Sequence, residues 1–184
     1  MHIKKLLGVL VLISFFFTAC ENKDDMSDIV ATSKQSSVKT YKLTQTDGSF
    51  LTVEYEKGKW RFKEFPNKVV LLSFWATWCT PCKAEIPHLN NLINKYKDDF
   101  IVLGILVEQD KNHDFVNQFI KEHNIQYPVT NGTENFRLAK DVGEVGAIPA
   151  MFMYDKTGKQ VAHYVGATPE EIIDNDINKY KGNK

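Results

Sequence analysis

The chain has 184 residues, of which 43% are hydrophobic, enough for one domain with appendages and a sizeable core. Its 23 basic side chains are matched by 23 acidic ones. The composition therefore shows neither the basic excess of a nucleic-acid-binding protein nor the acidic run of a solvating tail.

Residues 1–19 are predicted to be a signal peptide. They begin with a short positive stretch, and residues 6–17 form an apolar run that is too short to span a bilayer. Phe17-Thr18-Ala19-Cys20 resembles a bacterial lipobox, which implies cleavage before Cys20 and a lipid on its thiol, although Leu is usual where Phe17 stands. The alternatives are an ordinary secretory signal or an uncleaved anchor, and either also places the domain outside the cytosol.

Residues 20–40 are predicted to be a lipid-attached tether, because they are polar with only short apolar patches. Residues 41–65 form a predicted N-terminal β extension, an extra hairpin in which turn signals separate alternating stretches, and Trp60 and Phe62 suggest a third short strand. Removal of the signal peptide leaves 21 basic against 23 acidic side chains. With Cys20 acylated, Cys79 and Cys82 are the only free cysteines.

Residues 66–182 are predicted to fold as one α/β domain with a central mixed sheet and flanking helices. An apolar run at residues 68–75 is typical of a strand covered on both faces, and a helical pattern and a second buried strand at residues 100–107 complete a βαβ unit. The later predicted elements are a helix at 114–123, an extended segment at 125–129, a helix at 134–141, antiparallel strands at 150–154 and 160–165, and a final helix that begins with Thr168-Pro169-Glu170-Glu171 as a capping box.

Cys79 and Cys82 stand where the first buried strand ends and a helix begins, the edge at which α/β sheets bind ligands. A closed metal site is disfavoured, since it needs about four ligands, the chain has no second cysteine pair, and its histidines form no metal-like doublet. A weak copper site made by the pair with His163 stays open. A structural staple is disfavoured because a bridge across three residues closes a very small loop.

A reactive pair has a physical rationale. At a helix N-terminus, amide groups and the helix dipole favour the thiolate of Cys79, which is the nucleophilic form. Cys82 lies one turn further along and can reach the same sulfur. Pro81 suits a first helical turn, and Thr80 and Pro81 between them set how strongly the thiolate is favoured.

The stretch Phe74-Trp75-Ala76-Thr77-Trp78-Cys79-Thr80-Pro81-Cys82 resembles the thioredoxin superfamily over residues 66–182. Pro87 matches the kinking proline of the family's first helix, and the segment that ends in Pro149 matches the one before its cis-proline strand. The resemblance implies a thioredoxin-like fold, a redox-active disulfide between Cys79 and Cys82, and a cis bond before Pro149. It also implies substrate contacts from Trp78, Thr80, Pro81, Ile148 and Pro149.

Two further positions are similar to the TlpA/ResA group of membrane-tethered proteins. Ser73 stands where thioredoxin has a buried Asp, and Glu85 lies three residues after Cys82. The resemblance implies that Glu85 tunes the cysteines or relays their protons, since a carboxylate near a thiol pair shifts both pKa values. The alternative for Glu85 is a solvated helix residue. Several members of the group reduce apocytochrome c before haem attachment.

The predicted function is therefore an extracytoplasmic thiol–disulfide oxidoreductase that reduces protein disulfides, such as the CxxCH bridge of an apocytochrome c. It needs no metal or organic cofactor, and a membrane electron donor of the thiol type re-reduces it. A disulfide oxidase or isomerase stays open, since the Thr80-Pro81 dipeptide does not fix the redox potential. So does a copper-binding protein or copper-site thiol reductant for oxidase assembly. A peroxide reductase is disfavoured, because Ala76 stands where that chemistry needs a Thr.

Overall fold

The computed structural model describes residues 37–143 and 145–182. The predicted signal peptide, Cys20 and most of the predicted tether lie outside the described residues. None of the helices in the described ranges combines the length and apolar character needed to cross a membrane.

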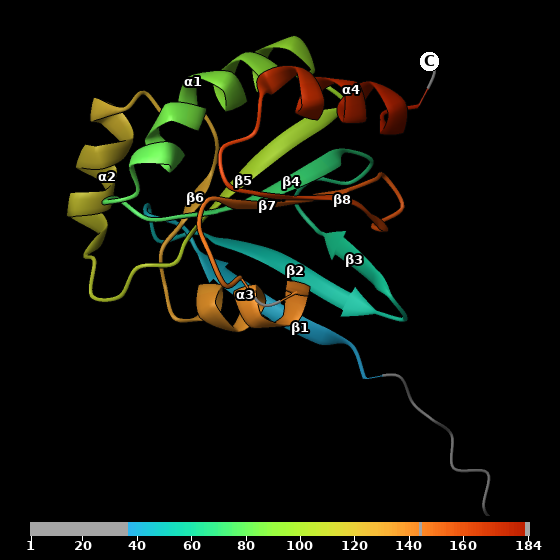
Figure 1. Ribbon diagram of the computed structural model, residues 1–184. Helices are drawn as coiled ribbons and strands as arrows, with labels where there is room; N and C mark the ends of the chain where they lie inside the picture. The colour runs from blue at the N-terminus through green and yellow to red at the C-terminus, as the bar shows by residue number, and fades with distance from the viewer. Residues whose placement is uncertain (1–36, 144, 183–184) are drawn as a thin grey trace, which may run out of the picture. The chain divides into compact units, whose positions relative to one another are not determined.

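The described part of the chain contains two β-sheets (Figure 1). The first is antiparallel, in the order β1–β2–β3, with β1 at Lys39–Thr44, β2 at Phe50–Glu56 and β3 at Lys59–Phe62. The second has the order β6–β5–β4–β7–β8, and its strands in that order are Val129–Thr130, Phe100–Leu106, Val69–Trp75, Ala150–Tyr154 and Gln160–Val165. Since β4 pairs in parallel with β5 and antiparallel with β7, the predicted mixed sheet is confirmed.

Helices cover both faces of the five-stranded sheet (Figure 1). On one face lie α1 (Thr80–Lys95), α2 (His113–Glu122) and α4 (Glu170–Tyr180). On the other face lie α3 (Glu134–Gly143) and the three-stranded sheet. The cysteines thus stand where β4 passes into α1, at the carboxyl end of the parallel pair.

Strand β4 separates two hydrophobic clusters. Every residue from Val69 to Trp75 is buried, and side chains alternate between the faces of a strand. Val69, Leu71 and Trp75 therefore pack toward α1 and α2, whereas Val70, Leu72 and Phe74 pack toward α3 and the three-stranded sheet. Because both faces are covered, the strand has no polar face, and the sequence shows one continuous apolar run.

The N-terminal extension is a three-stranded antiparallel sheet, and its third strand contains Trp60 and Phe62, as predicted. Backbone hydrogen bonds tie both of its ends to the main domain. At one end, the backbone N–H of Asn131 donates to the carbonyl of Thr44 at 2.8 Å. At the other end, the N–H of Trp60 donates to the carbonyl of Gly158, in the turn between β7 and β8, also at 2.8 Å. These bonds hold the extension against the α3 face of the sheet.

The predicted capping box at the last helix is wrong. Helix α4 begins at Glu170 with Pro169 as its N-cap, and no side chain caps it. Thr168 is engaged elsewhere: its N–H donates to Glu85 and its hydroxyl donates to the carbonyl of Gly166. A long-range partner has therefore replaced the local cap.

Other boundaries differ by a few residues. Helix α2 begins one residue earlier than predicted, because the side chain of Asn112 caps it by accepting the N–H of Phe115 at 2.7 Å. Of the extended segment predicted at residues 125–129, only Val129 lies in a strand, the two-residue β6. Strands β7 and β8 have the predicted bounds.

Candidate active site

The site is built on the loop between β4 and α1. Cys79 is the N-cap of α1, and its Sγ accepts a hydrogen bond from the backbone N–H of Cys82 at 3.3 Å. Cys79 and Cys82 form a disulfide, with their Cα atoms 5.3 Å apart. The backbone amide that now contacts Sγ lies where it would stabilise a negative sulfur once the bond is reduced.

The first turn of α1 adds nothing that opposes negative charge. Pro81 occupies one of its first two positions, and the turn contains no acidic side chain. Thr80 and Pro81 are exposed, whereas the two cysteines retain only 3% and 5% of their accessible surface. The disulfide is thus largely buried, and a substrate must approach it past the neighbouring loops.

The residues expected to contact substrate differ in exposure. Trp78 is 66% exposed beside the buried Cys79, whereas Trp75 packs in the core at 5%. The bond between Ile148 and Pro149 is cis, and the carbonyl of Pro149 accepts the N–H of Gly166 at 2.8 Å. Pro149 itself is buried and Ile148 is half-buried.

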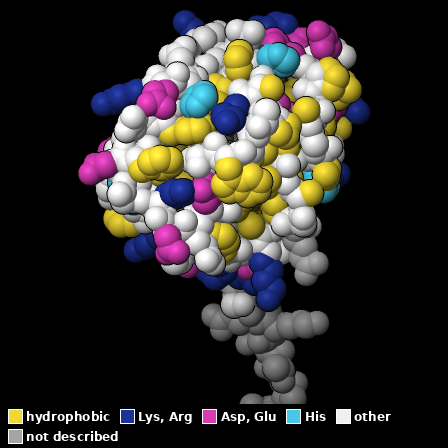
Figure 2. Space-filling model, turned by 60° about the vertical axis from the view of Figure 1, so that its left-hand side comes forward, with side chains coloured by type: hydrophobic (Ala, Val, Ile, Leu, Met, Phe, Trp, Pro, Cys, Tyr) yellow, Lys and Arg dark blue, Asp and Glu magenta, His cyan; other side chains and the backbone are white. Residues whose placement is uncertain are grey.

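A pocket of about 680 Å³ opens beside Trp78 and Ile148. Its lining is mainly apolar and comes from the cysteine loop, the end of β5, helix α3 and the cis-proline loop: Trp78, Val107, Phe136, Ala139, Lys140, Val145, Gly146, Ala147 and Ile148. Hydrophobic side chains gather across the side of the molecule on which α1 begins, interspersed with charged ones (Figure 2).

Glu85 lies on the buried face of α1 and is only 4% exposed. Its Oε1 accepts the backbone N–H of Thr168 at 2.8 Å. Burial raises the pKa of Glu85 above its ordinary value, although the Thr168 N–H and the charge of His88 oppose the rise. The alternative of a solvated helix residue is therefore wrong, and Glu85 is a buried carboxyl one helical turn from Cys82.

Glu108 is a further residue beside the cysteine loop. It follows β5, and its Oε2 accepts both the N–H and the hydroxyl of Thr77, at 2.9 and 2.7 Å. Lys111 pairs with its other oxygen at 3.1 Å. Burial opposes the charge of Glu108, but the bonds from Thr77 and Lys111 outweigh it and hold its pKa below the usual range. The carboxylate thereby fixes the backbone two residues before Cys79.

The geometry bears on two alternative functions. His163 lies on β8 and stacks on Phe152, whose side chain packs on the α3 face, so it is not brought to the cysteines. Within residues 37–143 and 145–182, no group of three His, Cys, Asp or Glu side chains is placed to hold a metal ion. The hydroxyl of Thr77 donates to Glu108 and is not available to assist peroxide at Cys79.

Three comparisons place the chain among known proteins. Residues 33–181 match the Redoxin family. Thiol-disulfide oxidoreductase ResA of Bacillus cereus is 33% identical over 135 residues, which cover 71% of this chain and 74% of that relative. ResA of Bacillus subtilis is 28% identical over 149 residues, covering 81% and 76% of the two chains. The exposed lipoprotein thioredoxin Etrx1 of Streptococcus pneumoniae matches with a TM-score of 0.60 and 23% identity over 77% of this chain and 99% of that one, which confirms the thioredoxin-like fold.

Proposed function

Since this chain belongs to the Redoxin family and is a ResA-like thiol–disulfide oxidoreductase, we propose that it reduces protein disulfides outside the cytoplasm. One observation carries the proposal: Cys79 caps α1 and its sulfur accepts the N–H of Cys82, within a disulfide that is already formed. A sulfur so placed is stabilised as a thiolate after reduction and can act as a nucleophile.

The proposed reaction has two steps. The thiolate of Cys79 attacks one sulfur of the substrate disulfide, a mixed disulfide forms, and the other substrate sulfur leaves as a thiolate. Cys82 then loses its proton and attacks Cys79, which restores the Cys79–Cys82 disulfide and releases the second substrate thiolate. The substrate gains two electrons and the protein loses two. A membrane electron donor of the thiol type returns them.

Glu85 is the proposed proton carrier for this cycle. Cys82 must be deprotonated before it can attack, and the departing thiolates must be protonated. A carboxyl whose pKa is raised by burial takes up and releases protons closer to neutral pH than an exposed one does. Glu85 stands on the same buried face of α1 as Cys82, which is the cysteine that needs a base.

The proposed substrate is a segment of polypeptide, such as the CxxCH bridge of an apocytochrome c. The apolar pocket beside Trp78 and Ile148 supports a protein substrate, because it offers a hollow for a side chain next to Trp78, the residue before Cys79. Trp78, Thr80, Pro81, Ile148 and Pro149 are the proposed contact residues. The choice of an apocytochrome rests on the resemblance to the TlpA/ResA group.

The proposed location is extracytoplasmic, with the domain anchored to a bacterial membrane by lipid on Cys20. The apolar run at residues 6–17 and the lipobox-like sequence before Cys20 support this proposal. The similar structure from Streptococcus pneumoniae is described as an exposed lipoprotein.

The test uses the purified full chain, reduced beforehand, with insulin as the protein disulfide. Cys79→Ser should abolish reduction, and Cys82→Ser should accumulate a mixed disulfide, because the resolving thiol is missing. Cys20→Ser is the matched control, since it removes the third cysteine and leaves the pair intact. Insulin reduction at the wild-type rate by Cys79→Ser would overturn the proposal.

The direction of electron flow is tested separately. Equilibration of the Cys79/Cys82 couple with glutathione should give a potential near that of thioredoxin, about −270 mV. A value near −120 mV is that of an oxidant and would contradict a reducing role.

A further inference from the structure

Helix α3 forms one wall of the pocket beside the disulfide. Phe136, Ala139 and Lys140 line the pocket, whereas Arg137 and Asp141 contact β1. At about 100° per residue, the pocket-lining residues fall within an arc of about 100° around the helix, and the centre of the arc that holds Arg137 and Asp141 lies about 130° away from theirs. The contacts between α3 and β1 therefore fix the position of this pocket wall.

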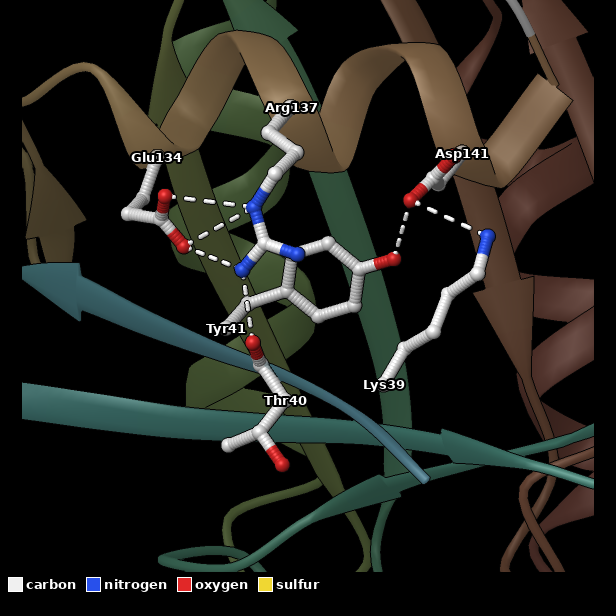
Figure 3. Close-up of polar contacts among 6 residues, drawn as sticks. All are labelled: Lys39, Thr40, Tyr41, Glu134, Arg137 and Asp141. Carbon is white, nitrogen blue, oxygen red and sulfur yellow. Dashed lines mark hydrogen bonds and ion pairs between the residues drawn. The ribbon is translucent and has the colours of Figure 1, made fainter. Parts of the chain in front are cut away.

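The contacts on that side form a connected polar cluster, which we call the β1–α3 clasp: Lys39, Thr40, Tyr41, Glu134, Arg137 and Asp141 (Figure 3). The hydroxyl of Tyr41 donates to Oδ2 of Asp141 at 2.5 Å. Arg137 donates to the carbonyl of Thr40 at 2.6 Å, and its guanidinium lies over the ring of Tyr41, 4.2 Å from the centroid. Tyr41 is fully buried, so one side chain joins the hydrophobic cluster and the clasp.

Charge is balanced within the clasp. Arg137 is paired with both carboxylate oxygens of Glu134, and Lys39 lies 3.4 Å from Asp141. Burial and the bond to Asp141 raise the pKa of Tyr41, and the same bond, with help from Lys39, lowers the pKa of Asp141. At neutral pH the phenol therefore stays a donor and the carboxylate stays an acceptor.

The clasp adds a constraint that apolar packing alone does not supply. Leu138 and Val142 seat α3 in the second hydrophobic cluster, and Asn135 ties its first turn to the carbonyls of Leu106 and Thr130, each at 2.9 Å. Apolar contact is not directional and allows a helix to roll, whereas hydrogen bonds hold a fixed geometry. After the first turn of α3, the hydrogen bonds that join this helix to β1 are those of the clasp.

We propose that Tyr41, Arg137 and Asp141 are positioning residues for protein substrates, because they hold α3 against β1 and so set the width of the pocket beside Cys79 and Cys82. The N-terminal sheet is then part of the substrate-recognition apparatus, although its strands do not line the pocket. This inference rests on the proposed function, since it assigns the pocket to a segment of the protein whose disulfide is reduced.

The test compares Tyr41→Phe with Tyr164→Phe in the full chain. Each substitution removes one tyrosine hydroxyl that donates to an aspartate, but the bond from Tyr164 to Asp176, at 2.6 Å, joins β8 to α4, away from the pocket. The rate constant is measured with insulin and with bis(2-hydroxyethyl) disulfide, which is too small to reach α3. Tyr41→Phe should lower the insulin rate constant about 3- to 10-fold, the equivalent of one hydrogen bond. It should leave the small-disulfide rate and the Cys79/Cys82 potential unchanged.

The outcomes separate the inference from the proposed function. If wild-type protein fails to reduce insulin, the proposed function falls and the inference falls with it. If wild type reduces insulin and Tyr41→Phe matches Tyr164→Phe, or if Tyr41→Phe slows both disulfides equally, only the inference is overturned. Should Tyr41→Phe not fold, as judged by thermal unfolding, Arg137→Lys keeps the cation but cannot reproduce the planar contacts to Thr40 and Glu134, and it should change the same two rates in the same way.

Discussion

Replacement of Glu85 by Gln and by Ala separates its structural part from its chemical part. Gln keeps an oxygen that can accept the N–H of Thr168, the bond that is 2.8 Å long in the native protein. Ala removes the acceptor and leaves that N–H without a partner. The structural cost should therefore appear in Glu85→Ala alone, whereas loss of a titrating carboxyl should appear in both variants.

The expected magnitudes follow from the geometry. An amide hydrogen that loses its partner in a shielded site costs about 1–3 kcal/mol. For a domain of about 150 residues this lowers the melting temperature of Glu85→Ala by about 2–12 °C. Glu85→Gln should melt close to wild type at acid pH. Loss of a general acid–base group should slow insulin reduction by about 100-fold in both variants.

The pH dependence has a definite sign. The pKa of Glu85 is raised in the folded protein, because burial disfavours the carboxylate. Wild type therefore loses stability as the pH rises from the unfolded-state pKa of the carboxyl to its folded-state pKa, and the loss persists above that range. Glu85→Gln has no such loss, so its stability relative to wild type should increase from acid to neutral pH.

Thermal unfolding by circular dichroism from pH 4 to pH 8 and insulin reduction from pH 5 to pH 9 measure these effects. If Gln and Ala variants melt at the same temperature, the bond to Thr168 does not contribute as argued. If Glu85→Gln keeps the wild-type rate and pH profile, Glu85 carries no proton in the reaction.

Three further changes test other parts of the structure. Glu108→Ala removes the acceptor for both bonds from Thr77 and should lower the unfolding free energy by about 1–3 kcal/mol in urea titrations. Because the pKa of Glu108 is depressed in the folded protein, this difference between wild type and variant should shrink as the pH falls through the folded-state pKa. A difference that does not depend on pH would contradict the assignment. Trp78→Ala should change stability by no more than about 0.5 kcal/mol, since the side chain is 66% exposed, but should lower the rate constant for insulin about tenfold, and an unchanged rate would remove Trp78 from the contact surface. Gly158→Ala should destabilise the protein by roughly 3 kcal/mol or more, since φ is +80° and the new Cβ would lie 1.8 Å from the carbonyl oxygen of Trp60; a wild-type melting temperature would show that this turn can move.

The features that were predicted best from the sequence are those that its local pattern determines. A fully buried strand must be apolar on both faces, so β4 could be read directly from residues 68–75. The placement of Cys79 at the head of a helix followed from the change of periodicity after Trp75. The cis bond before Pro149 could not be derived from its neighbours and came only with the family resemblance.

Contacts between distant segments could not be predicted in the same way. Thr168 has the sequence of a helix cap, but its N–H is used by Glu85, 83 residues earlier in the chain. Tyr41 and Asp141 are 100 residues apart, and nothing in either local pattern indicates the other. Glu108 offered a weak signal, since an acidic residue directly after a parallel strand stands at the edge where sites form.

The place where β1 begins has a consequence for orientation. Lys39 pairs with Tyr55, and Trp60 on β3 donates to the carbonyl of Gly158 in the turn between β7 and β8. Tyr154, just before that turn, pairs with Val70 at the start of β4, whereas Cys79 follows the end of β4. If Cys20 carries lipid as proposed, the tether joins the domain at the end opposite the disulfide and spans at most about 65 Å when fully extended. With the disulfide facing away from the membrane, the domain would meet newly exported polypeptides; with the disulfide facing the membrane, it would meet the proposed membrane electron donor. Shortening the tether should then slow re-reduction of the disulfide before it affects substrate binding.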